Sequence, residues 1–166
     1  MNFTLCKNNL INIIMQVFQN QFTTTTELSG IVIDFKPDIF FLFISPLFPN
    51  TKEFIAKLNL KFPDALSIGC STAGEILGNE VLDNSIVLTA VKFEKTKLKL
   101  VDINLKNHGM DSYKTGQKIS NALKSEDLRH IFVLSDGLEV NGAELVSGLH
   151  NDLEKSVSIT GGLAGD

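Results

Sequence analysis

The sequence predicts an α/β fold for one domain over residues 1–166: a layered, mostly parallel sheet with flanking helices and an inserted antiparallel hairpin. Three observations predict it. Strand and helix patterns alternate along the chain, residues 22–75 resemble residues 113–166, and a stretch of strand and turn patterns at about 76–105 separates the two copies. A chain of this length that is 43% hydrophobic can bury a single core.

The internal repeat emerges when the sequence is shifted by 91 residues, which gives 11 identical pairs over 54 positions. Each copy contains a buried apolar strand, followed by an asparagine with a glutamate three residues later. We assign these asparagines, Asn50 and Asn141, to helix capping, because their side chains can accept from the exposed N–H groups of the first turn. The alternative to a true repeat is that any two helix–strand units would show this much similarity.

The first copy is expected to begin after a strand at about 11–18. Leu28, Ile31, Val32 and Phe35 recur at helical spacing and predict a helix at 24–35. The remaining elements follow from a buried apolar run, an amphipathic stripe and a second apolar run. They are a strand at 39–45, a helix at 51–62 and a strand at 65–70.

The stretch between the copies predicts the inserted hairpin. The turn dipeptide Gly78-Asn79 stands between short apolar pieces, and two longer strands are expected at 85–93 and 97–105, joined by 94–96. In the second of these strands lysine and leucine alternate, which is typical of a strand with one solvent-exposed face. The second copy then supplies a helix at 113–124, a strand at 130–135, a helix at 142–153 and a strand at 156–161.

Composition excludes several classes of function. The formal charge is −4, with Arg129 as the single arginine, one tyrosine and no tryptophan, so a surface that follows phosphates and stacks bases is not expected. The most apolar stretch, residues 39–48, is half the length of a membrane-spanning helix. Two cysteines are too few for a disulfide scaffold, which favours a reducing, cytoplasmic location without a membrane.

The predicted ligand site lies at the carboxyl ends of the strands, where ligands bind in parallel sheets. Small residues there let the main chain approach a ligand, and carboxylates could hold an ammonium group. We expect glycine amides to bind a carboxylate and Glu75 or Asp166 to bind the ammonium of an amino-acid-like ligand, with the 75–105 region as the moving part. The candidate residues are Gly69, Cys70, Ser71, Thr72, Gly74, Glu75, Asp136, Gly161, Gly162 and Asp166.

Several residues keep a second interpretation. Asp136, Glu75 and Asp166 could be ordinary turn acids exposed to solvent, and Cys70 could be a nucleophile but is more simply a small buried cysteine. The three histidines show no spacing that places one beside Cys70 or that forms a zinc site. No lysine lies in the 69–75 segment and no helix follows it, so a phosphate loop is not expected. We therefore predict no catalytic residue, no metal site and no enzyme activity.

The runs 68–76, 135–138 and 145–149, together with the final Gly-Gly-Leu-Ala-Gly-Asp of residues 161–166, resemble the N-terminal part of the FIST domain. The first and last of these motifs are the most specific. The resemblance covers roughly residues 12–166. Family members continue into a C-terminal FIST domain, so the resemblance implies a truncated protein.

The resemblance to FIST domains implies an intracellular sensory domain of a signal-transduction protein, here a bacterial one, that binds small ligands such as amino acids. It also implies work beside a histidine kinase, a chemoreceptor or a cyclic-dinucleotide enzyme. No cofactor is expected for the amino-acid alternative. Some FIST proteins are haem-containing nitric oxide sensors, so haem held by a histidine is the second alternative, and a thiol enzyme at Cys70 is the third.

Overall fold

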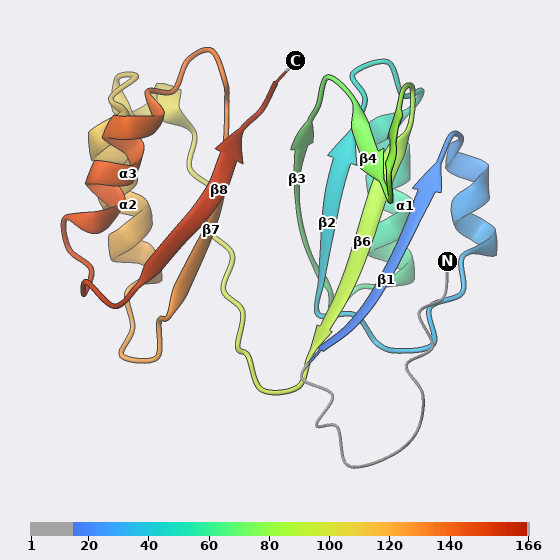
Figure 1. Cartoon of the computed structure of the whole chain (residues 1–166), viewed down its shortest axis with the longest axis horizontal. Coiled ribbons are helices and arrows are strands. Elements are labelled where there is room, and N and C mark those ends of the chain that lie inside the picture. The colour runs from blue at the N-terminus through green and yellow to red at the C-terminus, as the bar shows by residue number, and fades with distance from the viewer. Residues whose placement is uncertain (1–14, 166) are drawn as a thin grey trace.

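The computed structural model describes residues 15–165 and shows two main sheets side by side, besides a short two-stranded hairpin (Figure 1). The larger sheet has the strand order β1 (Met15–Phe22), β6 (Ile86–Phe93), β2 (Ile39–Ile44) and β3 (Leu66–Ser71). Only the β2–β3 pair is parallel, whereas β6 pairs antiparallel with both β1 and β2. The sheet is therefore mixed, and the predicted mostly parallel arrangement is wrong, because β6 lies between β1 and β2 and runs antiparallel to both.

The smaller sheet consists of β7 (His130–Ser135) and β8 (Ser158–Leu163), which pair in parallel. Its contacts with the larger sheet include a backbone bridge and a pair of aromatic rings. Thr72, just after β3, forms an isolated parallel bridge with Gly165, and the rings of Phe41 and Phe132 meet edge to face with centroids 5.4 Å apart. The carboxyl ends of β3 and β8 therefore lie next to each other.

Each sheet is covered on one face by helices. A 3-10 helix, η1 (Thr25–Gly30), and α1 (Thr51–Lys61) pack on the larger sheet around the fully buried Phe54 and Leu58. A second 3-10 helix, η2 (Leu105–His108), precedes α2 (Ser112–Leu123), which packs with α3 (Gly142–His150) on β7 and β8 around a smaller core. That core comprises the buried Ile131, Leu145, Leu149 and Val157.

The internal repeat corresponds to two strand–helix–strand units. The first unit is β2–α1–β3 and the second is β7–α3–β8, and in each the two strands are parallel. The shift of 91 residues carries the first strand and the helix start of one unit onto those of the other, Ile39 onto His130 and Thr51 onto Gly142. Along the last strand the match slips by one residue, because Ile39 pairs with Leu66 whereas His130 pairs with Ser158.

The predicted helix at 24–35 is wrong beyond residue 30. Residues after η1 run without regular helix to β2, and exposure alternates there: Ile31 is buried, Val32 is 80% exposed, and Ile33 and Phe35 pack against the core. This alternation is that of an extended chain. The apolar residues therefore follow the two-residue period of an extended strand, and Pro37 disfavours a helix in the residue before it.

The predicted pairing of 85–93 with 97–105 is also wrong. β6 matches the first of these strands, but its two edges are occupied by β1 and β2, so no edge remains for residues 97–104. The hairpin of this region is instead β4 (Glu75–Leu77) with β5 (Glu80–Leu82), around Gly78-Asn79. The strand expected at 11–18 lies partly outside the described residues, and β1 extends to Phe22.

The other predicted elements are confirmed within a few residues at their ends: β2, α1, β3, α2, β7, α3 and β8. Within residues 15–165, no helix combines the length and the apolar character that crossing a membrane requires.

Candidate functional site

The structure brings together the two glycine-containing segments that the sequence singles out. Gly69, Cys70 and Ser71 form the last half of β3, and Thr72 bridges to Gly165 just beyond Gly161 and Gly162 of β8. Gly69 and Gly161 play the same part in their units: a Cβ on either would collide with the carbonyl oxygen of the residue opposite, Leu42 or Val133. The two segments therefore lie side by side because the fold brings the ends of β3 and β8 together. The remaining predicted residue, Asp166, lies outside the described residues.

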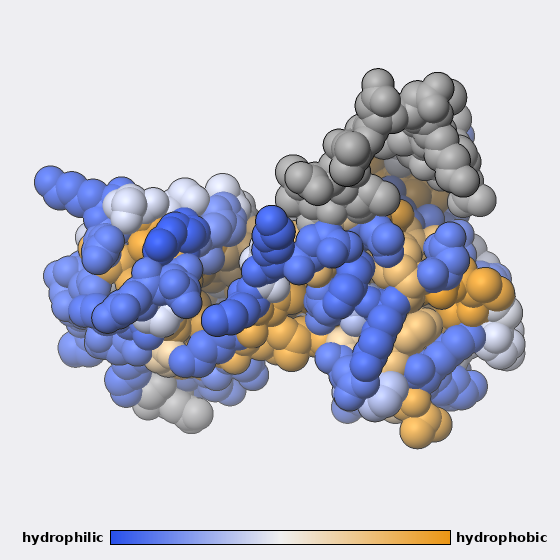
Figure 2. Space-filling model, turned by 90° about the horizontal axis from the view of Figure 1, so that it is seen from below, coloured by the Kyte–Doolittle hydropathy of each residue, from blue (hydrophilic) through white to orange (hydrophobic). Residues whose placement is uncertain are grey.

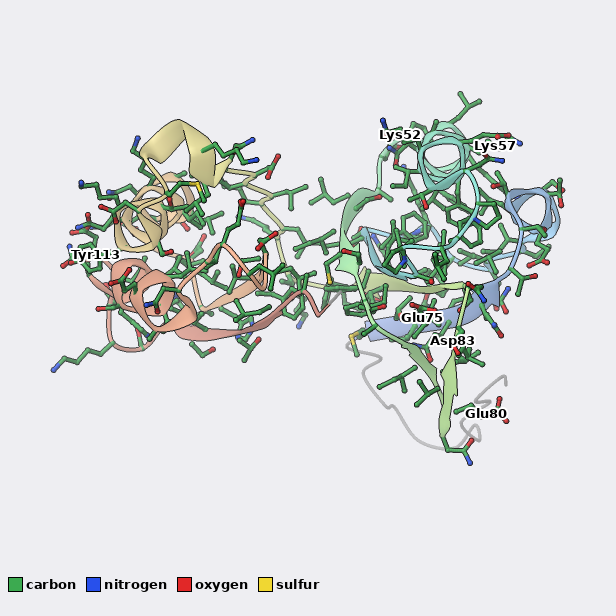
Figure 3. The ribbon with its side chains drawn as sticks, turned by 90° about the horizontal axis from the view of Figure 1, so that it is seen from above. Lys52, Lys57, Glu75, Glu80, Asp83 and Tyr113 are labelled. Carbon is green, nitrogen blue, oxygen red and sulfur yellow. The ribbon has the colours of Figure 1, made fainter. Side chains whose placement is uncertain are left out.

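Glu75 is not a carboxylate at a solvent-exposed rim. It is 1% exposed, accepts a hydrogen bond from Thr72 Oγ1 at 2.9 Å and another from Ser85 Oγ at 3.1 Å, and lies inside the body (Figure 3). A buried carboxyl group needs such donors, because burial without them is costly. Glu75 therefore ties the turn after β3 to the start of β6, and Gly74 packs against Val81 of the hairpin. Neither the ligand role nor the exposed-turn alternative describes Glu75.

One pocket, of about 380 Å³, lies between α1 and the carboxyl ends of β2 and β3, and we call it the α1 pocket. It contains three of the predicted site residues and carries no charged side chain. Its lining is Leu42, Ile44, Ser45, Pro46, Thr51, Ile55, Ser67, Ile68, Gly69, Cys70 and Ser71. Since no acid reaches it, this pocket offers nothing that would hold an ammonium group.

A second pocket, of about 340 Å³, lies between the segment 99–106, α2 and β7, and we call it the β7 pocket. Its walls are largely apolar, with Ile119, Leu123, Ile131 and Leu145 among them. Its charged lining residues are Lys99, Asp102, Lys106, Asp136 and Glu139. None of these five side chains forms an ion pair with another described residue. Charges of both signs without ion-pair partners therefore line a pocket that also has apolar walls, which suits a zwitterion.

Asp136 stabilises the turn after β7 and also lines this pocket. Its Oδ1 accepts hydrogen bonds from the backbone N–H groups of Leu138 at 2.8 Å and Glu139 at 2.7 Å, so it caps the turn after β7. Those bonds, Glu139 first, and the nearby charge of Lys106 hold the pKa of Asp136 below its usual value, so the group is ionised at neutral pH. The turn interpretation of Asp136 is confirmed, and its place in the pocket lining keeps the ligand interpretation open.

The haem and thiol alternatives both need a histidine, and among the side chains that the structure describes none lines either pocket. His130 lies on β7 with both ring nitrogens hydrogen-bonded, Nδ1 to Ser158 Oγ at 2.7 Å and Nε2 to Thr160 Oγ1 at 2.8 Å, and His150 ends α3. Among the side chains that the structure describes, no three His, Cys, Asp or Glu groups converge on a metal position. Neither His130 nor His150 therefore lies in a pocket that could hold a haem, and no described histidine lines the α1 pocket beside Cys70.

Lys99, Asp102, Lys106 and Glu139 are the charged pocket residues that the sequence did not predict. Glu139 left a signal, since it follows Asp136 by three residues at a strand end. Lys106 left none, because its position depends on the path of residues 97–104, which the pattern misassigned to a hairpin. Figure 2 shows hydrophobic side chains gathered between the two sheets on the face seen from below.

An α/β domain with glycine-containing strand ends and a charged pocket beside them has the arrangement in which small-ligand sites commonly lie. The family model of the FIST N domain matches residues 38–166, and the chain belongs to this family. It is therefore a sensory, small-ligand-binding domain of the signal-transduction type, as the sequence motifs predict. No curated protein and no solved structure matches the chain.

Proposed function

We propose that this FIST domain senses an amino-acid-like ligand bound in the β7 pocket, in the cytoplasm of a bacterium. The observation that carries the proposal is the pairing of an apolar pocket with Lys106, Asp136 and Glu139. The ammonium group lies at Asp136 and Glu139, the carboxylate at Lys106, and the side chain points to the apolar wall. This differs from the site that the sequence predicts, because Glu75 is buried and hydrogen-bonded to hydroxyl groups.

Ligand binding signals only if the ligand prefers one of two states of the domain. The segment 99–106 is the part of the pocket wall that belongs to no sheet, and it connects β6 to η2 and α2. A ligand that contacts this segment and β7 together favours the state in which the two are held at a fixed distance. A histidine kinase, a chemoreceptor or a cyclic-dinucleotide enzyme would read that state.

Calorimetric titration of the full chain against the twenty L-amino acids tests the proposal. At least one is expected to bind, and Asp136→Asn, which keeps an oxygen to cap the turn, weakens that binding about tenfold through loss of a charge-assisted hydrogen bond. Glu80→Gln is the control, because Glu80 lies on the projecting β4–β5 hairpin away from the pocket (Figure 3). Absence of binding by every amino acid, or equal affinity in Asp136→Asn, contradicts the proposal.

A further inference from the structure

The edge of β7 that faces away from β8 carries main-chain groups without partners. In the ladder with β8, Ser158 N–H donates to Arg129 O and Ala164 N–H to Ser135 O, so the odd-numbered residues of β7 direct their main-chain groups toward β8. The even-numbered residues therefore direct theirs to the other edge. There, no described residue pairs with the N–H and C=O groups of Phe132 and Leu134.

The β7 pocket lies along this edge. Residues Ile131 to Asp136 form one wall and residues Lys99 to Lys106 form the opposite wall. The second wall has no regular secondary structure before η2, and it is tethered to neighbouring elements: Lys97 pairs with Asp127 at 3.9 Å, and Lys99 Nζ donates to the Ala122 carbonyl at the end of α2. The pocket therefore lies between the two segments, and no ladder joins them among the described residues.

Unpaired main-chain groups on a strand edge are a template for another strand. A free amino acid fills the charged end of the pocket but leaves the groups of Phe132 and Leu134 without partners. An extended peptide satisfies both, since its amides pair with the strand edge while alternate side chains face the apolar wall that α2 and α3 provide. Lys106, Asp136 and Glu139 together carry one net negative charge, which favours an ammonium group at that end.

We propose that the ligand is a short apolar peptide with a free N-terminus, which adds to β7 as a strand and places its ammonium group at Asp136 and Glu139. This inference rests on the proposed function and narrows its ligand class from amino acids to peptides. Main-chain hydrogen bonds supply affinity and the apolar wall selects side chains.

Titration of the unaltered full chain with L-alanine, L-leucine, trialanine, trileucine and the two tripeptides N-methylated at both amides tests the inference. The better tripeptide is expected to bind at least tenfold more tightly than its amino acid, and N-methylation, which removes the amide donors, is expected to cost at least tenfold. If neither tripeptide exceeds its amino acid, the peptide inference is overturned while sensing of amino acids stands. If none of the six compounds and no other amino acid binds, the proposed function fails as well.

Amide hydrogen exchange locates the binding. With the tripeptide bound, the N–H groups of Phe132 and Leu134 are expected to exchange at least tenfold more slowly, whereas that of Val133, which already faces β8, does not change.

The variant Leu134→Pro removes one outward N–H and keeps the ladder with β8, since proline is tolerated where the N–H faces away from the sheet. It is expected to weaken binding of the tripeptide at least tenfold more than binding of the amino acid; unchanged exchange at Phe132 and Leu134 contradicts the strand geometry even if the variant fails to fold.

Discussion

The turns after β2 and β7 occupy equivalent places in the two units and differ in one residue that decides the chemistry nearby. Ser45 Oγ accepts from Leu47 N–H at 3.3 Å, just as Asp136 Oδ1 accepts from Leu138 N–H. Ser45 is 7% exposed and lines the uncharged α1 pocket, whereas Asp136 is exposed and lines the charged β7 pocket. The same backbone turn is therefore compatible with a neutral or an ionised acceptor, and the neighbouring elements determine which one the site can hold.

The helices of the two units also begin differently, although both follow an asparagine. Asn141 caps α3 with a bond from Glu144 N–H at 3.2 Å, and its predicted role is confirmed. Asn50 has a left-handed backbone with φ of 61° and makes no capping bond, so its predicted role is wrong. Its backbone places the side chain where it cannot reach the first turn, and asparagine is one of the few residues that tolerate this conformation.

Truncation of the matched core leucines is expected to give the largest difference between the units. Leu58 and Leu149 are both fully buried at equivalent helix positions. Leu58→Ala and Leu149→Ala should each lower the free energy of unfolding by about 2–5 kcal/mol. Leu58 should lie at the upper end, because its larger core can relax less around the cavity. Urea denaturation of both variants measures this order; a larger loss for Leu149→Ala would show that the small core is the more rigid one.

A smaller loss of stability is expected from a substitution at the close contact between α2 and α3 in the second unit. A Cβ on Gly148 would collide with the carbonyl oxygen of Tyr113, so α2 and α3 approach each other through this glycine. Gly148→Ala should cost about 1–3 kcal/mol of stability through overpacking. The equivalent residue in the first unit is Lys57, whose ion pair with Glu53 is half exposed. Lys57→Ala is therefore the matched control and should cost under about 1 kcal/mol.

A loss at Gly148 no larger than at Lys57 would mean that the helices of the second unit separate without cost. In that case the substitution should also widen the β7 pocket, since α2 forms one of its walls. Thermal denaturation of the two variants at equal protein concentration distinguishes these outcomes.

Local patterns predicted the repeated elements well, because each depends on residues close in sequence. The buried face of each repeated element can be predicted from its own apolar pattern. Examples are the apolar run of β2, the stripe Phe54, Ile55 and Leu58 of α1, and their equivalents in the second unit. The insertion of β6 between β1 and β2 depends instead on pairings over long separations, which alternation does not reveal. Residues 97–104 alternate in sequence but form no strand, since both edges of β6 are occupied, so the predicted strand and its predicted partner are both wrong.

The candidate site divides in the same way. The adjacency of Gly69 to Thr72 with Gly161 to Gly165 follows from two parallel units whose strands end together, which the repeat made predictable. The burial of Glu75 was not predictable, because it depends on Ser85 at the start of β6 and on the position of that strand. The place of Lys106 in the β7 pocket was not predictable either, because it depends on the path of residues 97–104.

The smallest expected effect is a dependence of stability on pH that belongs to the second unit. The bonds from Glu139 and Leu138 lower the pKa of Asp136 in the folded state, so its carboxylate stabilises the fold above the unfolded value of about 3.9. This contribution is lost as the pH falls through the lowered pKa. Asp136→Ser replaces the carboxylate with the acceptor that Ser45 uses, so the variant should lose less stability than the parent between pH 5 and pH 2. Urea denaturation across that range measures the slope, with Asp83→Ser beside the hairpin as the control for loss of one charge; equal slopes in the parent and Asp136→Ser would show that the turn hydrogen bonds do not depend on ionisation.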